Sequence, residues 1–272
     1  MSAPAVPLRR GLTRRQRARL VRAVQYAVVV VVVALAALAA DWGEIRRAFL
    51  DLGVAAELVP RVFVVGLKNT LLYTACGFGF GLALGIVLAL MRLSSVGPYR
   101  WAATAVIEVF RGLPALVVFI ALGYGLPIAL GVRVPGDVLG TVTVALGLVG
   151  AAYMAETIRA GIEAVPKGQT EAARSLGMSH SRAMVSIVLP QAFRIILPPL
   201  TNELILLTKD SSLVYLLGLT LATQELTSLG REALNQYASM TPILVIGLCY
   251  LLITVPLSIL VRRLEARNAR AR

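Results

Sequence analysis

Histidine, cysteine and charged residues are scarce in this sequence of 272 residues, and each shortage excludes a kind of chemistry. The single histidine, His180, lies outside the apolar runs, so neither a histidine-based metal cluster nor a serine–histidine nucleophile pair is available inside a membrane. The two cysteines, Cys76 and Cys249, fall within apolar runs and say nothing about redox compartment. Only 15% of the residues are charged whereas 58% are hydrophobic, which is the composition of a membrane protein. We therefore expect no metal site and no enzymatic activity.

The hydrophobic residues lie in long runs, each able to cross a hydrocarbon core roughly 30 Å thick with about 20 helical residues. The runs cover residues 23–40, 70–90, 112–132, 138–155, 195–219 and 240–261. The fifth run carries Glu203, Lys209 and Asp210, which we expect to face the interior of a helix bundle. The sequence thus predicts an all-α, polytopic membrane helix bundle with about six spans.

The net charge of +13 arises from basic residues that gather on one set of loops. Nineteen Lys and Arg residues lie before residue 23, at 91–100, at 159–194 and after 261, against five on the other loops. The positive-inside rule then places both termini in the cytoplasm. Because membrane topology accounts for the charge, we expect no nucleic-acid partner. We also expect the first run to be retained, since its 18 apolar residues are long for a cleaved signal peptide.

The second run contains Gly77, Gly81 and Gly85 at four-residue spacing. Residues four apart share one face of a helix, and glycine lets a neighbouring backbone approach that face closely. We interpret these glycines as a helix-packing surface.

The longest cytoplasmic segment, residues 159–194, is punctuated by helix breakers and caps. Pro166 and Gly168 are expected to break the preceding helix, and Thr170 to cap a short helix with Glu171 in its first turn. That helix should stop at Gly177, the residue type best suited to a left-handed turn.

A second short helix should follow, capped by Ser179 and ending near Pro190. On the first helix, Ala172, Ala173 and Leu176 are expected to share a small, mildly apolar face. Such a face suits insertion into a groove of another protein.

These markers resemble the EAA loop of permease subunits in bacterial ATP-binding-cassette (ABC) importers. The matching residues are Glu171, Ala172, Ala173, Gly177, Ile187, Leu189 and Pro190. The stretch Pro166-Lys167-Gly168-Gln169 is similar to the loop in the polar amino acid branch of that family, as is Gly66-Leu67-Lys68-Asn69-Thr70. Arg111-Gly112-Leu113-Pro114 resembles an Arg-Gly-Thr-Pro motif, with leucine where threonine is usual.

The resemblance implies a five-helix permease core preceded by one additional N-terminal span. It also implies assembly with a second permease subunit, the same or related, with two ATP-binding subunits and with an extracytoplasmic substrate-binding protein in the inner membrane. No G-x-x-x-x-G-K-[ST] motif occurs, so we expect ATP to be bound by the partner and no cofactor by this chain. The implied cargo is a polar amino acid, with a mild preference for glutamate or glutamine.

The implied organisation assigns each segment a place. Residues 1–22 form a basic cytoplasmic arm, 23–61 the extra span and an outside segment, 62–261 the permease core with its EAA loop at 159–194, and 262–272 a basic cytoplasmic tail.

Charged and amide side chains within the apolar runs are candidates for the translocation path or its gate, because burying them in lipid is costly. Six are assigned this role: Glu108, Arg111, Asn202, Glu203, Lys209 and Asp210. Glu156 and Arg159, three residues apart, are interpreted instead as a structural ion pair. Two alternatives remain open: a secondary transporter in which such charges relay protons, and a membrane enzyme.

Overall fold

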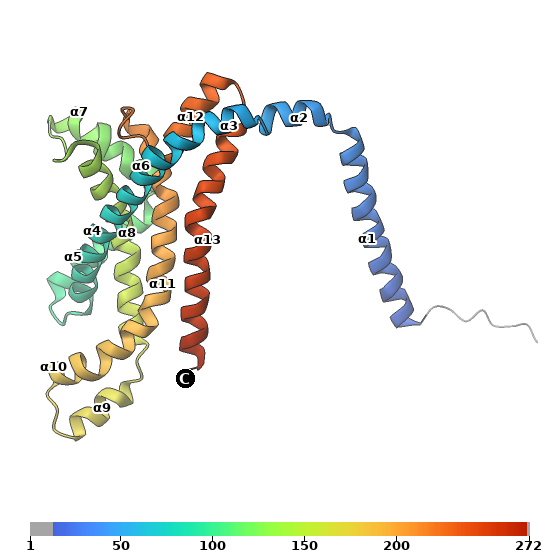
Figure 1. Ribbon diagram of the computed structural model, residues 1–272. Helices are drawn as coiled ribbons and strands as arrows, with labels where there is room; N and C mark the ends of the chain where they lie inside the picture. The colour runs from blue at the N-terminus through green and yellow to red at the C-terminus, as the bar shows by residue number, and fades with distance from the viewer. Residues whose placement is uncertain (1–12, 271–272) are drawn as a thin grey trace, which may run out of the picture. The chain divides into compact units, whose positions relative to one another are not determined.

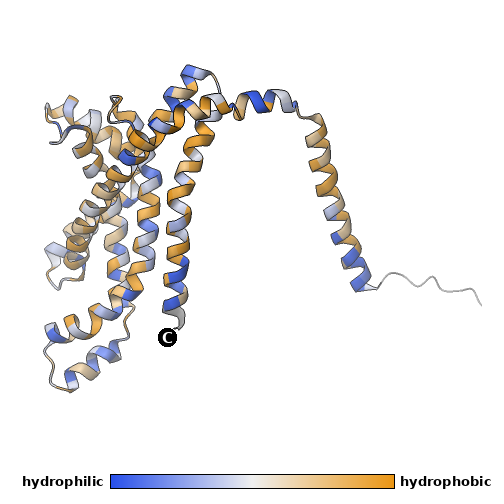
Figure 2. Cartoon of the chain, viewed as in Figure 1, coloured by the Kyte–Doolittle hydropathy of each residue, from blue (hydrophilic) through white to orange (hydrophobic). Residues whose placement is uncertain are grey.

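The computed structural model describes residues 13–270, which form two units that divide between Leu50 and Asp51. In the first unit, α1 (Arg14–Ala39) begins with a capping box in which the side chains of Thr13 and Gln16 reach each other's backbone N–H groups. No residue of α1 is buried within the chain. Figure 2 shows a hydrophilic start followed by hydrophobic turns, as expected for a helix that enters lipid from a basic end. The short helix α2 (Trp42–Phe49) follows.

The second unit is built on two long helices, α4 (Lys68–Leu93) and α8 (Asp137–Glu163) (Figure 1). α3 (Leu52–Arg61) and the π-helical turn η1 (Val62–Leu67) lead into α4. The three spaced glycines of α4 face α8, so they form the helix-packing surface that their spacing predicted. A Cβ atom built on Gly81 would lie 3.0 Å from the carbonyl oxygen of Gly147, so only glycine allows this approach without a shift. α4 and α8 therefore form a closely packed pair.

The third predicted run is preceded by a helix that the prediction did not include. α5 (Gly97–Gly112) ends before Pro114, and α6 (Ala115–Ile120), η2 (Ala121–Gly125) and α7 (Leu126–Leu130) follow at an angle of 104°. The apolar run at 112–132 is thus only the second half of a broken helix whose first half carries Glu108 and Arg111. The hydropathy reading missed α5, because the polar residues of this helix hide its helical character.

After α8 come α9 (Lys167–Ser175), α10 (His180–Ala183) and the π-helical turn η3 (Met184–Val188), which continues into α11 (Leu189–Asp210). The predicted helix end near Pro190 is also wrong. Pro190 lies in the first turn of α11, where its missing N–H is not needed. The 3₁₀ helix η4 (Ser211–Leu217) extends α11, and α12 (Leu226–Tyr237) and α13 (Thr241–Arg270) complete the chain.

The described residues are all-helical, without strands, which confirms the predicted fold class. Five helical segments are long and apolar enough to cross a membrane, or six if the bent pair around Pro114 is one span. α9 and α10 lie at one end of the second unit, and α3, α7 and α12 at the other (Figure 1). We call these the α9 end and the α12 end.

Candidate functional site

The EAA loop, residues 159–194, is organised by two helix boundaries. α9 begins directly after Pro166, whose fixed φ pre-forms the first turn, so Thr170 lies inside the helix and does not cap it as predicted. Gly168 also lies within α9. Ser179 does cap the next helix, because its side-chain oxygen accepts a hydrogen bond from the backbone N–H of Arg182 at 3.3 Å.

Gly177 ends α9 in a left-handed conformation, with φ +85°, as its position in the sequence predicted. The N–H of Gly177 donates to the carbonyl of Arg174 at 2.9 Å, and the N–H of Met178 donates to that of Ala173 at 3.1 Å. This pair of bonds is the Schellman motif, which satisfies the last carbonyls of a helix and turns the chain sharply.

The predicted small face of α9 is divided. Ala173 is only 6% exposed and packs within the chain, whereas Leu176 is 86% exposed and Glu171 and Ala172 are also on the surface. Farther along, Ile187 is half-buried, and Leu189 and Pro190 are exposed.

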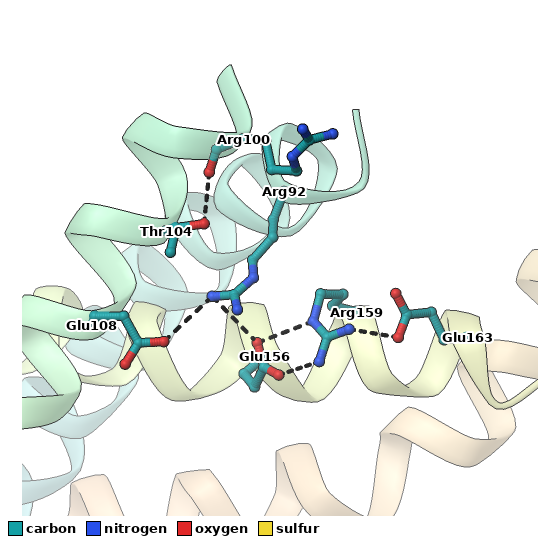
Figure 3. Close-up of polar contacts among 7 residues, drawn as sticks. All are labelled: Arg92, Arg100, Thr104, Glu108, Glu156, Arg159 and Glu163. Atoms are coloured by element: carbon teal, nitrogen blue, oxygen red, sulfur yellow. Dashed lines mark hydrogen bonds and ion pairs between the residues drawn. The ribbon is translucent and has the colours of Figure 1, made fainter. Parts of the chain in front are cut away.

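Five charged side chains form a cluster where α4, α5 and α8 meet (Figure 3). Arg159 donates to Glu156, with its Nε 3.1 Å from Oε2, and also pairs with Glu163. The Nη1 atom of Arg92 lies 3.7 Å from Glu108 and 3.8 Å from Glu156, and it is buried. The predicted ion pair of Glu156 with Arg159 is present, and Arg92 extends it to two further helices.

The six predicted path residues divide between two places. Glu108 contacts Arg92 at 3.7 Å, and the Arg111 guanidinium lies 5.7 Å from the centre of the Tyr153 ring. The other four lie on the second half of α11. Of these, Asn202 and Lys209 are exposed, and Glu203 and Asp210 are half-buried. None of the four takes part in an ion pair within the described part of the chain.

A buried polar cluster around Glu225, at the α12 end, was not predicted from the sequence. Glu225 is fully buried and caps α12, accepting hydrogen bonds from the backbone N–H and hydroxyl of Ser228 at 2.7 and 2.6 Å. Burial raises the pKa of the Glu225 carboxyl, and the hydrogen bonds from Ser228 and Thr227 oppose that shift. No sequence signal marked this cap, because glutamate is not among the residue types that favour the N-cap position.

The chain matches the family model described as "Binding-protein-dependent transport system inner membrane component" over residues 81–270. It is 38% identical over 76% of its length to a probable glutamine ABC transporter permease of Bacillus subtilis, covering 93% of that protein. It is 39% identical to the glutamate/aspartate import permease of Escherichia coli O157:H7, with 79% of this chain and 97% of that one covered.

Among solved structures, a crystal structure of an amino acid ABC transporter with histidines is similar, with a TM-score of 0.72 and 35% identity, over 80% of this chain and 99% of that one. The fold and these matches define a multi-pass inner-membrane permease subunit, which is not itself catalytic. The chain belongs to the family of binding-protein-dependent transport system inner membrane components.

Proposed function

We propose that this permease carries polar amino acids, with glutamate or glutamine as the favoured cargo. The similar permeases from B. subtilis and E. coli are named for glutamine and for glutamate/aspartate, and a third, from B. subtilis, for arginine. The EAA loop supports coupling to separate ATP-binding subunits. Its helix α9 ends in a Schellman turn that presents Leu176 at 86% exposure, a geometry suited to a groove in a partner.

In the proposed complex, two ATP-binding subunits lie at the α9 end, which faces the cytoplasm, and a substrate-binding protein delivers cargo at the α12 end. A second permease subunit completes the path. The half-buried Glu203 and Asp210 and the exposed Asn202 and Lys209 line that path on α11, because such side chains are costly to leave in lipid. Glu108 and Arg111 on α5 belong to the same path or its gate.

Uptake by the purified complex in proteoliposomes tests this function. With ATP inside and binding protein outside, labelled glutamine or glutamate should accumulate, and a non-hydrolysable ATP analogue should abolish the uptake. Accumulation by the permease alone on a proton or sodium gradient would contradict the proposal and favour a secondary transporter. In the same assay, wild-type rates for Arg111→Gln, Glu203→Gln and Lys209→Met alike would contradict the path assignment.

A further inference from the structure

The loop at residues 218–225, between η4 and α12, is held by side chains of α4. The side-chain amide of Asn69 donates to the carbonyls of Ala222 and Gln224, both at 2.8 Å. The hydroxyl of Tyr73 donates to the carbonyl of Thr223 at 2.7 Å. Asn69 and Tyr73 are 9% and 3% exposed, so the donor side chains are buried, and the bond from Asn69 to Gln224 is buried at both ends. Buried hydrogen bonds of this kind are costly to leave unmade.

The start of α12 is tied to the same face of α4. The hydroxyl of Thr70 accepts a hydrogen bond from the backbone N–H of Leu226 at 3.2 Å, one of the donors that a helix start leaves unpaired. Glu225 caps this helix start, and the Tyr250 hydroxyl of α13 donates to its carboxylate at 3.3 Å. Thr70 and Glu225 are both 0% exposed.

The other side of η4 contacts the broken helix. The Tyr124 hydroxyl donates to the carbonyl of Leu216. A Cβ atom built on Gly123 would lie 2.3 Å from a methyl carbon of Leu217, so the leucine lies directly against the glycine backbone. η4 is thus attached to α4 through the several hydrogen bonds of the loop at 218–225. Its contact with η2 consists of the hydrogen bond from Tyr124 and the apolar contact of Leu217 with Gly123.

We propose that four buried side chains are positioning residues for transport, because they make the loop at 218–225 and α12 move as one body with α4. The four are Asn69, Thr70, Tyr73 and Glu225. The close packing of α4 on α8 extends that body to both long helices. Any shift of the last turns of α11 then occurs at the weaker contact of η4 with Gly123 and Tyr124. This inference rests on membership of the permease family and not on the identity of the cargo.

Two threonines of α4, one turn apart, provide a matched test. Thr70→Val removes the acceptor for the Leu226 N–H, whereas Thr74→Val removes a buried hydroxyl that donates only to the carbonyl of Thr70 in its own helix. Tyr73→Phe removes the bond to Thr223, with the exposed Tyr99→Phe as its control. Hydrogen exchange at 218–226 and transport per assembled complex are measured for each variant.

We expect Thr70→Val and Tyr73→Phe to assemble with the ATP-binding subunits but to exchange about fivefold faster at 218–226, the factor that one lost hydrogen bond corresponds to. Their binding-protein-stimulated transport per complex should fall by at least the same factor, roughly fivefold, with basal ATPase unchanged. Thr74→Val and Tyr99→Phe should match the wild type, and Thr70→Ser should restore both properties.

Two results would overturn the inference. Faster exchange at 218–226 with wild-type transport per complex shows a merely structural role. Unchanged exchange in both variants shows that these bonds do not hold the loop. If Thr70→Val does not assemble, the Tyr73→Phe result decides alone.

A disulfide tests the proposed place of movement. A disulfide between Gly123→Cys and Leu217→Cys, verified by mass spectrometry, should block transport reversibly. Undiminished transport in the oxidised state would show that movement occurs elsewhere. Hydrogen exchange is measured without any cargo. A failure of the proposed substrate class would therefore leave the exchange results unchanged and can be told apart from a failure of this inference.

Discussion

Gly177 shows how one residue can be required for its backbone and not for its size. Its φ of +85° lies in the left-handed region, yet no atom lies within 4 Å of the position that a Cβ atom would take. A side chain would therefore fit in space but would strain the backbone. Gly168, in the same helix α9, has equally open surroundings and no positive φ. Substitutions at these two glycines therefore distinguish the effect of backbone strain from the effect of adding an exposed side chain.

We expect Gly177→Val to cost about 1 kcal/mol or more, because a β-branched residue resists the left-handed conformation. Complexes should still assemble, but stimulation of ATP hydrolysis by the binding protein should fall, since the Schellman turn that presents Leu176 is distorted. Gly168→Val, with the same added side chain, should retain stimulation. Normal stimulation in Gly177→Val, measured on purified complexes, would show that this turn has no part in coupling.

At the scale of elements, what could be predicted depended on whether the cause was local. The glycine spacing of α4, the caps at Ser179 and Gly177 and most of the apolar runs follow from neighbouring residues alone. The helix α5 could not be predicted in this way. Its polar residues Glu108 and Arg111 have their partners, Arg92 and Tyr153, on other helices. The continuation through Pro190 depends on the π-helical turn η3 just before it, which has no recognisable sequence signal.

The candidate site divides in the same way. The succession of two short helices and a turn along the EAA loop was predictable, because caps and turns depend on only a few neighbouring residues. The division of its small face was not, because burial of Ala173 depends on packing within the folded chain. The buried cluster around Glu225 joins residues about 150 positions apart, such as Thr70 and Leu226, and no spacing rule connects them.

The packing of α4 on α8 can be tested with two nearby glycines. Gly81→Ala would place its Cβ 3.0 Å from the carbonyl oxygen of Gly147 and 3.3 Å from the N of Ala151, both backbone atoms that cannot rotate away. Overpacking of this kind costs about 1–3 kcal/mol. Gly79→Ala, on the exposed face of the same helix with no atom within 4 Å, should instead gain up to about 1 kcal/mol of helix propensity. In thermal denaturation of the protein in detergent, the unfolding midpoint should therefore be lower than that of the wild type for Gly81→Ala only. Equal midpoints for the two variants would contradict the close contact of α4 with α8.

For the whole molecule, the asymmetry of charge and the placement of helices agree on which segments share a side. Arg92 near the end of α4 and Arg100 in the first turn of α5 flank the loop between these helices. The EAA loop carries five basic residues, while the segments at the α12 end carry few. Since basic loops remain in the cytoplasm, the two termini and the α9 end should share that side. A single wrong crossing, for instance at the broken helix around Pro114, would reverse every later segment.

Single cysteines provide the test of this topology, in a background where Cys76 and Cys249 are replaced by alanine. A membrane-impermeant thiol reagent applied to intact cells should label cysteine at position 134, before α8, and at position 232, in α12. Cysteine in place of Ser95 or Ser175, both exposed in the structure, should be labelled only after the membrane is made permeable. The reason is that we expect the broken helix to cross the membrane once, which would place residues 95 and 134 on opposite sides. Protection of position 95 and position 134 alike in intact cells would show that α5, α6 and α7 form a re-entrant loop. The crossing by α8 would then place the α9 end outside, and its assignment to the cytoplasm would be wrong.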